Sequence, residues 1–172
     1  ATPGKTRQIF YYTISSAKDL VMVDSPGYGF AEGSIKEVQS WQTMMEMYIR
    51  RSPFLHRVLT LVDSRNRVTK TDQDLMDFLE QKQKPFILCF TKVDLIKDDE
   101  YKEVVDWCMK EMKKYTMASP FVHFTSAKKD KGISELGGNL TMLLSSEILS
   151  QQKRRAERGG GNPYKDLPGL KK

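Results

Sequence analysis

The chain has 172 residues, which is enough for one domain with a hydrophobic core of its own. Apolar residues make up 39% and charged residues 29% of the sequence, an ordinary composition for a globular domain, and the apolar runs are far too short to cross a bilayer. Cys89 and Cys108 fall in apolar segments without a paired pattern. We therefore expect two reduced core cysteines, a reducing compartment and no contact with a membrane.

The positive charge is concentrated at the C-terminal end of the chain. Residues 151–172 carry seven basic and two acidic side chains, so this tail holds +5 of the net charge of +6. A nearly neutral globule with a basic tail indicates an anionic partner, and nucleic acid is the usual one. The side chains predicted to bind RNA are Lys153, Arg154, Arg155, Arg158, Lys165, Lys171 and Lys172.

Apolar periodicity predicts strands and helices that alternate along the chain. In chain order we expect strands at 8–14 and 20–24, a helix at 34–51, a strand at 57–63, a helix at 71–82, a strand at 85–94, a helix at 99–115, a strand at 120–126 and a helix at 133–158. The caps predicted for the first two helices are Ser34 with Glu37, and Thr71 with Asp74. The residues predicted to face inward from the last helix are Ile133, Leu136, Leu140, Leu143 and Ile148.

This order predicts a doubly wound α/β fold, with a mostly parallel twisted sheet and helices on both faces. We expect one domain over residues 1–150, followed by a basic helix end and an extended tail over 151–172. Ligands of such sheets bind beyond the carboxyl ends of the strands. The residues that directly follow each strand are therefore the candidates for a functional site.

Three strand ends carry polar motifs that agree with one another, namely 24–27, 91–94 and 125–128. A Thr-Lys-x-Asp sequence suits guanine, because Asp94 can accept hydrogen bonds from its ring N–H and exocyclic amine, whereas adenine offers an acceptor there. The stem of Lys92 can lie across the base, and the amide of Ala127 can donate to the guanine carbonyl while Ser126 holds the loop. The predicted nucleotide-binding residues are Gly27, Thr91, Lys92, Asp94, Thr125, Ser126 and Ala127.

The first of these motifs has the pattern Asp-x-x-Gly. It is suited to presenting the carboxylate of Asp24 to Mg²⁺ and the amide of Gly27 to a terminal phosphate. Each motif alone is explained as well by a turn, a cap or a solvated ion pair. Together, in this order after strands of one sheet, they favour a guanine-nucleotide site. Asp63 and Arg65 in "LVDSRN" either aid this site or form a salt bridge at a strand end.

Several segments resemble the EngB branch of the TrmE-Era-EngA-EngB-Septin-like GTPases, over about residues 2–145. They are "TPGKT", "DSPGYGFA", "SWQTMMEMYI", "LVDSRNRVTKTDQDLMDFL", "TKVD" and "TSAKKDKGISEL". The resemblance implies a Ras-like fold and a GTP hydrolase that uses GTP/GDP and Mg²⁺ and assists large ribosomal subunit assembly. It implies as partners the subunit precursor, its rRNA and ribosomal proteins, with the protein monomeric within the particle.

The resemblance also implies roles for particular residues near the start of the chain. Thr6 is the switch I threonine that binds Mg²⁺, Asp24 holds Mg²⁺ through water, and Gly27 donates its amide to the γ-phosphate. Tyr28 stands where Ras-like enzymes carry the glutamine that orients water. Hydrolysis is therefore expected to be slow without a partner, and no catalytic residue is assigned.

The sequence departs from the family at its two ends. No G-x-x-x-x-G-K-[ST] phosphate loop occurs in the chain, so it is either part of a longer protein or has lost nucleotide binding. The tail is longer than a minimal bacterial member needs, which favours the mitochondrial matrix, with the bacterial cytoplasm as the alternative. The rival functions are a catalytically inactive docking module on the ribosome precursor and a signalling GTPase with a protein effector.

Overall fold

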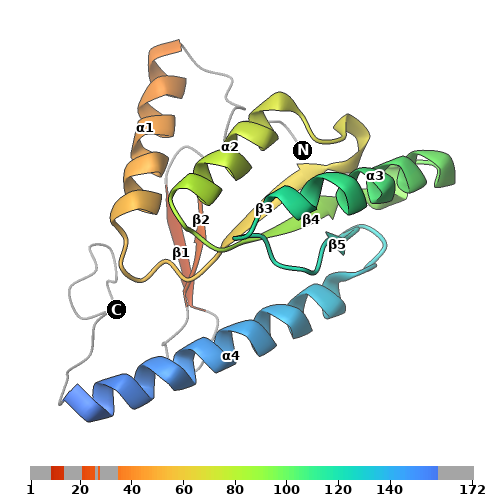
Figure 1. Cartoon of the computed structure of the whole chain (residues 1–172). Helices are drawn as coiled ribbons and strands as arrows, with labels where there is room; N and C mark the ends of the chain where they lie inside the picture. The colour runs from red at the N-terminus through yellow and green to blue at the C-terminus, as the bar shows by residue number, and fades with distance from the viewer. Residues whose placement is uncertain (1–8, 14–20, 26, 28–34, 159–172) are drawn as a thin grey trace.

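The computed structural model describes residues 9–13, 21–25, 27 and 35–158 (Figure 1). Its strands and α-helices are β1 (Phe10–Thr13), β2 (Val21–Asp24), α1 (Ile35–Arg51), β3 (Val58–Asp63), α2 (Lys70–Gln81), β4 (Phe86–Thr91), α3 (Asp98–Glu111), β5 (His123–Phe124) and α4 (Ile133–Arg158). Short 3-10 helices η1 (Ser64–Asn66), η2 (Val93–Leu95) and η3 (Met112–Lys114) lie between them. This order confirms the predicted alternation of strands and helices.

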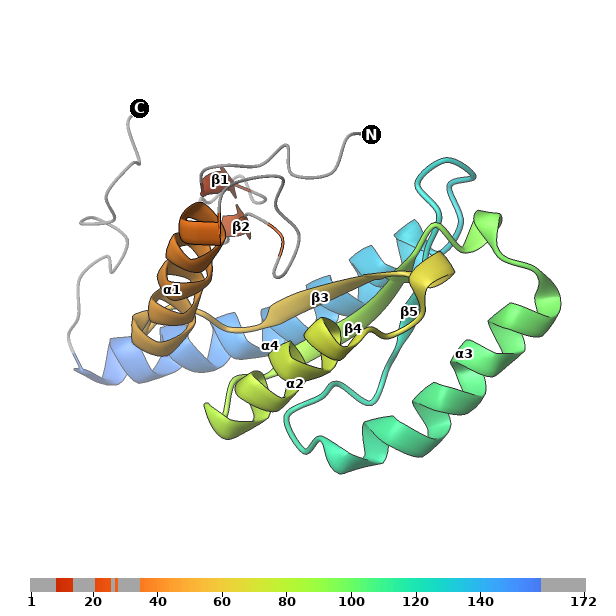
Figure 2. The same ribbon diagram turned by 90° about the horizontal axis from the view of Figure 1, so that it is seen from above.

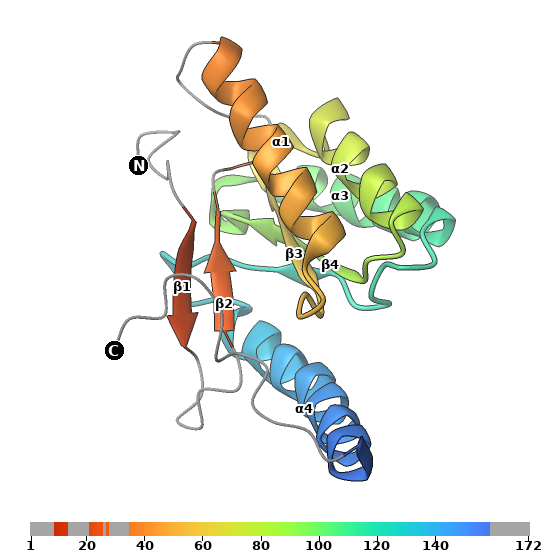
Figure 3. The ribbon, with the colours of Figure 1, turned by 90° about the vertical axis from the view of Figure 1, so that its left-hand side faces the viewer.

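The strands form two sheets among the described residues. β3, β4 and β5 make a parallel sheet in that order, and β1 pairs antiparallel with β2 as a separate ribbon. The parallel sheet lies between α2 and α3 on one side and α4 on the other, while the β1–β2 ribbon lies beside α1 (Figures 1 and 3). The mixed α/β fold with a parallel sheet is confirmed, whereas a single continuous sheet is not seen in the described part.

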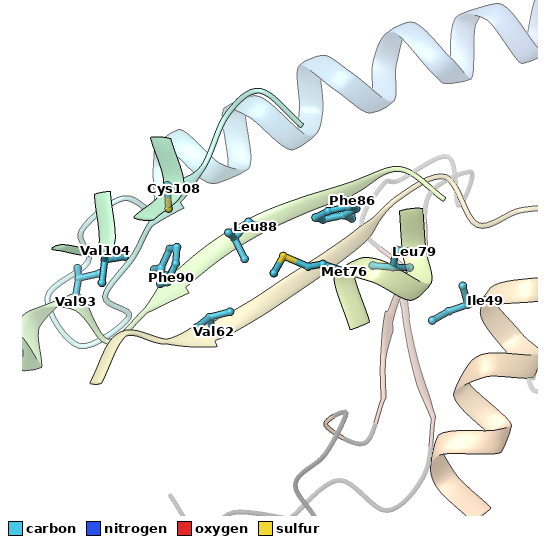
Figure 4. Close-up of a cluster of buried hydrophobic side chains, with 10 residues drawn as sticks. All are labelled: Ile49, Val62, Met76, Leu79, Phe86, Leu88, Phe90, Val93, Val104 and Cys108. Carbon is cyan, nitrogen blue, oxygen red and sulfur yellow. The ribbon is translucent and has the colours of Figure 1, made fainter. Parts of the chain in front are cut away.

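The hydrophobic core is built around β4. All five residues from Phe86 to Phe90 are completely buried, because helices cover both faces of this central strand. Residues from β3, α2, η2 and α3 complete the cluster in Figure 4, together with Ile49 near the end of α1. Cys89 and Cys108 are buried free thiols, as predicted, and burial raises the pKa of Cys108 to about 11.

The predicted cap of the second helix was wrong by two residues. Thr69, not Thr71, is the N-cap of α2: its hydroxyl accepts from the Asp72 amide at 3.3 Å. The Asp72 carboxylate in turn accepts from the Thr69 amide at 2.8 Å. Asp74 instead forms an ion pair with Lys70 on the helix surface. Both Thr-x-x-Asp spacings fit a capping box, so spacing alone could not separate them.

The inward face of the last helix was predicted only in part. Leu136, Leu140 and Leu143 are half-buried, but Ile133 is 40% exposed. Ile133 is the first residue of α4 and follows the exposed loop 127–131, so its exposure continues that of the loop before it. The side chain of Ile148 lies outside the described part of the structure, as do the Ser34 cap and residues 159–172 of the tail.

The capping box of α2 gives a direct test of the corrected helix start. We expect Thr69→Ala to lower the free energy of unfolding by about 1 kcal/mol, because an orphan amide loses its acceptor. Thr71→Ala is the matched control and should change it by less than about 0.5 kcal/mol, since this side chain has no capping role. Urea unfolding of both variants measures the difference, and a larger loss for Thr71→Ala would restore the original assignment.

Candidate functional site

The carboxyl ends of β3 and β4 lie side by side. Their parallel register pairs Asp63 with Thr91, the last residues of the two strands. The turns η1 and η2 follow these residues, and the loop after β5 comes to the same edge of the sheet (Figure 2). Segments that are far apart in the sequence therefore meet where a sheet of this kind binds ligands.

The Thr-Lys-Val-Asp turn after β4 is held from both sides. The hydroxyl of Thr91 donates to the Val62 carbonyl of β3 at 3.2 Å. The amide of Val93 donates to the Thr125 carbonyl of the loop after β5, also at 3.2 Å. Lys92 between them adopts a left-handed backbone with φ of 59°, which turns the chain sharply out of the strand. The turn is thus fixed in position by its two neighbouring segments.

Asp94 and Ser126 meet in a short hydrogen bond. The hydroxyl of Ser126 donates to Oδ1 of Asp94 at 2.5 Å, and the same oxygen of Ser126 accepts from the Lys129 amide at 3.1 Å. Ser126 is 1% exposed. Its hydroxyl is the main cause that lowers the pKa of Asp94, and the nearby charges of Lys128 and Lys129 add to this effect. The carboxylate is therefore ionised, and it keeps acceptor capacity for further donors.

The backbone of the 125–132 loop is closed by paired hydrogen bonds. Ser126 and Lys131 exchange amide-to-carbonyl bonds of 2.9 and 3.0 Å. Thr125 is buried, and both its amide and its hydroxyl donate to the Phe90 carbonyl, at 2.7 and 3.2 Å. Thr125 therefore fixes the loop to β4, while Ala127 stands exposed beyond it.

Asp63 forms an ion-pair cluster at this edge. Its carboxylate accepts from Nε and Nη2 of Arg65 at 2.9 and 2.6 Å, and from Nζ of Lys92 at 2.6 Å. The hydrogen bond from Arg65 is the main cause that holds the pKa of Asp63 well below its usual range, and Lys92 adds to it. The salt bridge at a strand end is thus present, and it includes a predicted nucleotide-binding residue. The sequence raised a salt bridge of Asp63 and Arg65 as one alternative, but it did not predict the contact with Lys92, which depends on the register of β3 with β4.

The other predicted site residues are not joined to this group. Asp24 and Gly27 are exposed, and no hydrogen bond or ion pair recorded among the described residues connects them to residues 91–94 or 125–127. Thr6, Tyr28, Lys165, Lys171 and Lys172 lie outside the described residues. In the described part of the chain, no group of three or more His, Cys, Asp or Glu side chains could hold a metal ion.

The described helices give no sign of a membrane span. None of them combines the length and the apolar character that crossing a bilayer requires. The basic end of α4 includes an exposed Lys153. The backbone of Arg154, Arg155 and Arg158 continues the helix, but their side chains lie outside the described part.

Two solved structures share this fold. A probable GTP-binding protein engB superposes with a TM-score of 0.65, at 21% identity over 84% of this chain and 84% of that chain. Era in complex with MgGDPNP and nucleotides 1506–1542 of 16S ribosomal RNA superposes with a TM-score of 0.61, at 19% identity over 81% of this chain and 45% of Era. The chain therefore has a Ras-like GTPase fold, as its sequence predicts.

Sequence comparisons narrow this class further. The sequence profile of the 50S ribosome-binding GTPase family matches residues 1–92. Proteins described as probable GTP-binding protein EngB are similar to the chain. The one from Hyphomonas neptunium is 35% identical over 83% of this chain and 66% of the relative, and the one from Kosmotoga olearia is 36% identical over 78% of this chain and 68% of the relative. A third, in Rhodospirillum rubrum, is 36% identical over 84% of this chain and 64% of the relative. The chain belongs to the EngB branch of the 50S ribosome-binding GTPases.

The match does not extend over the whole of these relatives. The chain spans 62 to 66% of the length of the first three EngB proteins that it matches. All three are bacterial proteins, from Hyphomonas neptunium, Rhodospirillum rubrum and Ruegeria. The sequence match to these relatives thus covers most of this chain but only about two thirds of each relative.

Gly132 closes the loop that carries Ser126, and its conformation can be tested by substitution. It has a φ of +70°, and a Cβ there would lie 2.1 Å from the Phe124 carbonyl oxygen. We expect Gly132→Ala to lower the free energy of unfolding by about 2–4 kcal/mol, because the backbone must shift. Gly138→Ala is the matched control: nothing lies within 4 Å of its Cβ.

The control should act in the opposite direction. Alanine in place of Gly138 inside α4 is expected to raise the free energy of unfolding by about 0.5–1 kcal/mol through helix propensity. Thermal unfolding of both variants measures the two effects. Equal stability of the two variants would contradict the tight approach of Gly132 to Phe124.

Proposed function

We propose that the full-length protein binds guanine nucleotides at the loops after β4 and β5, hydrolyses GTP and assists assembly of the large ribosomal subunit. The observation that carries the proposal is the 2.5 Å hydrogen bond between Ser126 and Asp94. It holds an ionised acceptor at the ligand-binding edge of the sheet, where guanine can offer two N–H donors. Similarity to other proteins supports the rest, because the chain belongs to the 50S ribosome-binding GTPases and its relatives are described as probable GTP-binding proteins.

The residues at the carboxyl ends of β3 and β4 and in the loop after β5 are suited to binding the guanine base, and these described residues do not form a metal site. Asp94 would accept from the base, the stem of Lys92 would lie across it, and the exposed Ala127 would offer its amide. These groups would be held in place by Thr91, Thr125 and Ser126, because the hydroxyl of each donates a hydrogen bond to another group of the protein. Gly27 is proposed to bind the γ-phosphate.

The cofactors that we propose are GTP or GDP and Mg²⁺. Mg²⁺ supplies charge neutralisation at the phosphates when it is bound. Of its two proposed ligands, Asp24 is exposed at the end of β2, and Thr6 lies outside the described residues. Tyr28, at the position of the usual glutamine, supports slow hydrolysis that a partner speeds up.

The partners that we propose are the precursor of the large subunit, with its rRNA and ribosomal proteins. The Era structure is a complex with 16S ribosomal RNA, so this fold can serve a protein that binds RNA. The bacterial relatives support the bacterial cytoplasm over the mitochondrial matrix as the location. Residues 1–150 would form the GTP-binding domain and residues 151–172 an RNA-binding extension.

One observation favours a second function. None of the 172 residues forms a G-x-x-x-x-G-K-[ST] phosphate loop, and a chain that lacks one throughout its gene would be an inactive docking module on the ribosome precursor. A signalling GTPase is less favoured, because the basic tail suits RNA. GTP binding and turnover by the full-length protein, with and without large-subunit precursors, separates the enzyme from the docking module.

Asp94 provides the sharpest test of base recognition. Asp94→Asn presents an amide donor where guanine has its amine and xanthine has a carbonyl. We expect GTP affinity to fall by about tenfold or more, and xanthosine triphosphate affinity to rise, because loss of one matched hydrogen bond to a charged group costs about 1.5–3 kcal/mol. Titration of the full-length protein with both nucleotides measures the switch.

The matched control is Asp106→Asn, a change of the same kind on the exposed surface of α3. It should leave both affinities unchanged. If Asp94→Asn keeps the wild-type preference for GTP over xanthosine triphosphate, residues 91–94 do not read the base.

The basic tail predicts a salt-dependent contact with RNA. Replacing the seven basic residues of 151–172 with glutamine should weaken binding to large-subunit precursors and flatten its dependence on salt, because fewer counterions are released. GTP affinity should stay the same. Binding measured between about 50 and 200 mM salt gives the slope, and an unchanged slope would rule out an RNA contact by the tail.

A further inference from the structure

The ammonium group of Lys92 is held by a carboxylate from the neighbouring strand. Nζ of Lys92 lies 2.6 Å from Oδ2 of Asp63, which ends β3. Lys92 itself follows β4, so the ion pair crosses between two strand ends that are 29 residues apart in the sequence. The long and otherwise exposed side chain is thereby drawn along the edge of the sheet.

The carboxylate of Asp63 is itself firmly oriented. Its side chain is only 19% exposed, and it accepts from the backbone amide of Arg65 at 3.1 Å as well as from the guanidinium. The side chain of Arg65 is 50% exposed, and its Nη2 donates to Oδ2 of Asp63, the same oxygen that accepts from Lys92. A bidentate guanidinium contact of this kind fixes the plane of the carboxylate.

The turn that carries Asp63 is tied to the turn that carries Lys92. Ser64 is 2% exposed, and its hydroxyl donates to the Thr91 carbonyl at 2.7 Å. The Thr91 hydroxyl donates back to the Val62 carbonyl. These two bonds flank the ion pair, so the distance between the two turns is set by buried contacts and not by the ion pair alone.

We propose that Asp63 is a positioning residue of the nucleotide site, which holds the ammonium of Lys92 so that its stem lies across the bound base. This inference rests on the proposed function. A free lysine side chain has many rotamers, and an anchor that already holds its end lowers the rotamer entropy that is lost on binding. Asp63 acts through Lys92 and touches no atom of the base.

The test is a double-mutant cycle in the full-length protein. Asp63→Asn should weaken GTP binding by about three- to tenfold, as expected for a partly exposed ion pair that is well oriented. Lys92→Met keeps an apolar stem without the ammonium. In the Lys92→Met background, Asp63→Asn should have no further effect on the Kd, because the group that Asp63 holds is already gone.

The preference among nucleotides separates the positioning role of Asp63 from the recognition of the base by Asp94. The stem of Lys92 lies on the face of the base, so Asp63→Asn should weaken GTP and ITP by the same factor. It should also leave the preference for GTP over xanthosine triphosphate unchanged, whereas Asp94→Asn reverses that preference. Isothermal titration with the three nucleotides gives these ratios.

Two matched controls complete the experiment. Glu111→Gln removes another ion pair whose carboxylate is similarly exposed, at 23%, and should leave every Kd unchanged. Arg65→Gln should weaken GTP binding less than Asp63→Asn does, since the contact with Lys92 remains. Equal losses for Arg65→Gln and Asp63→Asn, or additive losses for Asp63→Asn and Lys92→Met, would overturn the positioning role.

The outcomes also separate this role from the proposed function. If Asp94→Asn switches the base preference but Asp63→Asn binds GTP like the wild type, the positioning role alone is wrong. If the full-length wild type binds no guanine nucleotide, both the proposed function and this role are wrong.

Discussion

The pairing of β3 with β4 is the constraint on which the candidate site depends. β4 is buried along its apolar length, and its register with β3 is fixed because a slip of β3 by one residue would turn the buried Thr60 and Val62 outward and the 59% exposed Leu61 inward. In this register the last residues of the two strands, Asp63 and Thr91, stand opposite each other. The burial of apolar side chains thus decides which polar side chains meet at the edge.

The loop after β5 also depends on β4 for its position. β5 has only two residues, so its pairing with β4 is too short to orient a long loop by itself. The loop is instead fixed by the buried Thr125, by the exchange of bonds between Ser126 and Lys131, and by the close approach of Gly132 to the backbone. Backbone hydrogen bonds, not side-chain packing, therefore bring Ser126 to Asp94.

The parts of the fold that were predictable from sequence are those with long and strongly periodic signals. The buried run of β4 and the helices α2, α3 and α4 were predicted to within four residues at each end, because apolar periodicity reports burial directly. The cap at Thr69 and the exposure of Ile133 were missed. Both depend on where a helix begins relative to its neighbours, and two Thr-x-x-Asp spacings in one segment give the same local signal.

The candidate site was predictable in its residues but not in its connections. The motifs indicated that Asp94, Ser126 and Lys92 belong to one edge, and the structure brings them there. The ion pair of Asp63 with Lys92 was not predicted, since the sequence places the two residues 29 positions apart. The two residues come into contact only because the register of β3 with β4 places the ends of these strands side by side, and that register depends on the packing of the whole sheet.

The two carboxylates at this edge have different hydrogen-bond partners. Asp63 is surrounded by the cationic groups of Arg65 and Lys92, which occupy both of its oxygens. Asp94 is oriented by the neutral hydroxyl of Ser126, which holds one oxygen, while the charges of Lys128 and Lys129 act on it from nearby. A carboxylate whose charge is already paired serves as an anchor, whereas one held by a neutral donor keeps its attraction for further N–H groups. The same residue type thus has different hydrogen-bond partners at the end of β3 and in the turn after β4, and the difference comes from the segments that the fold brings beside each carboxylate.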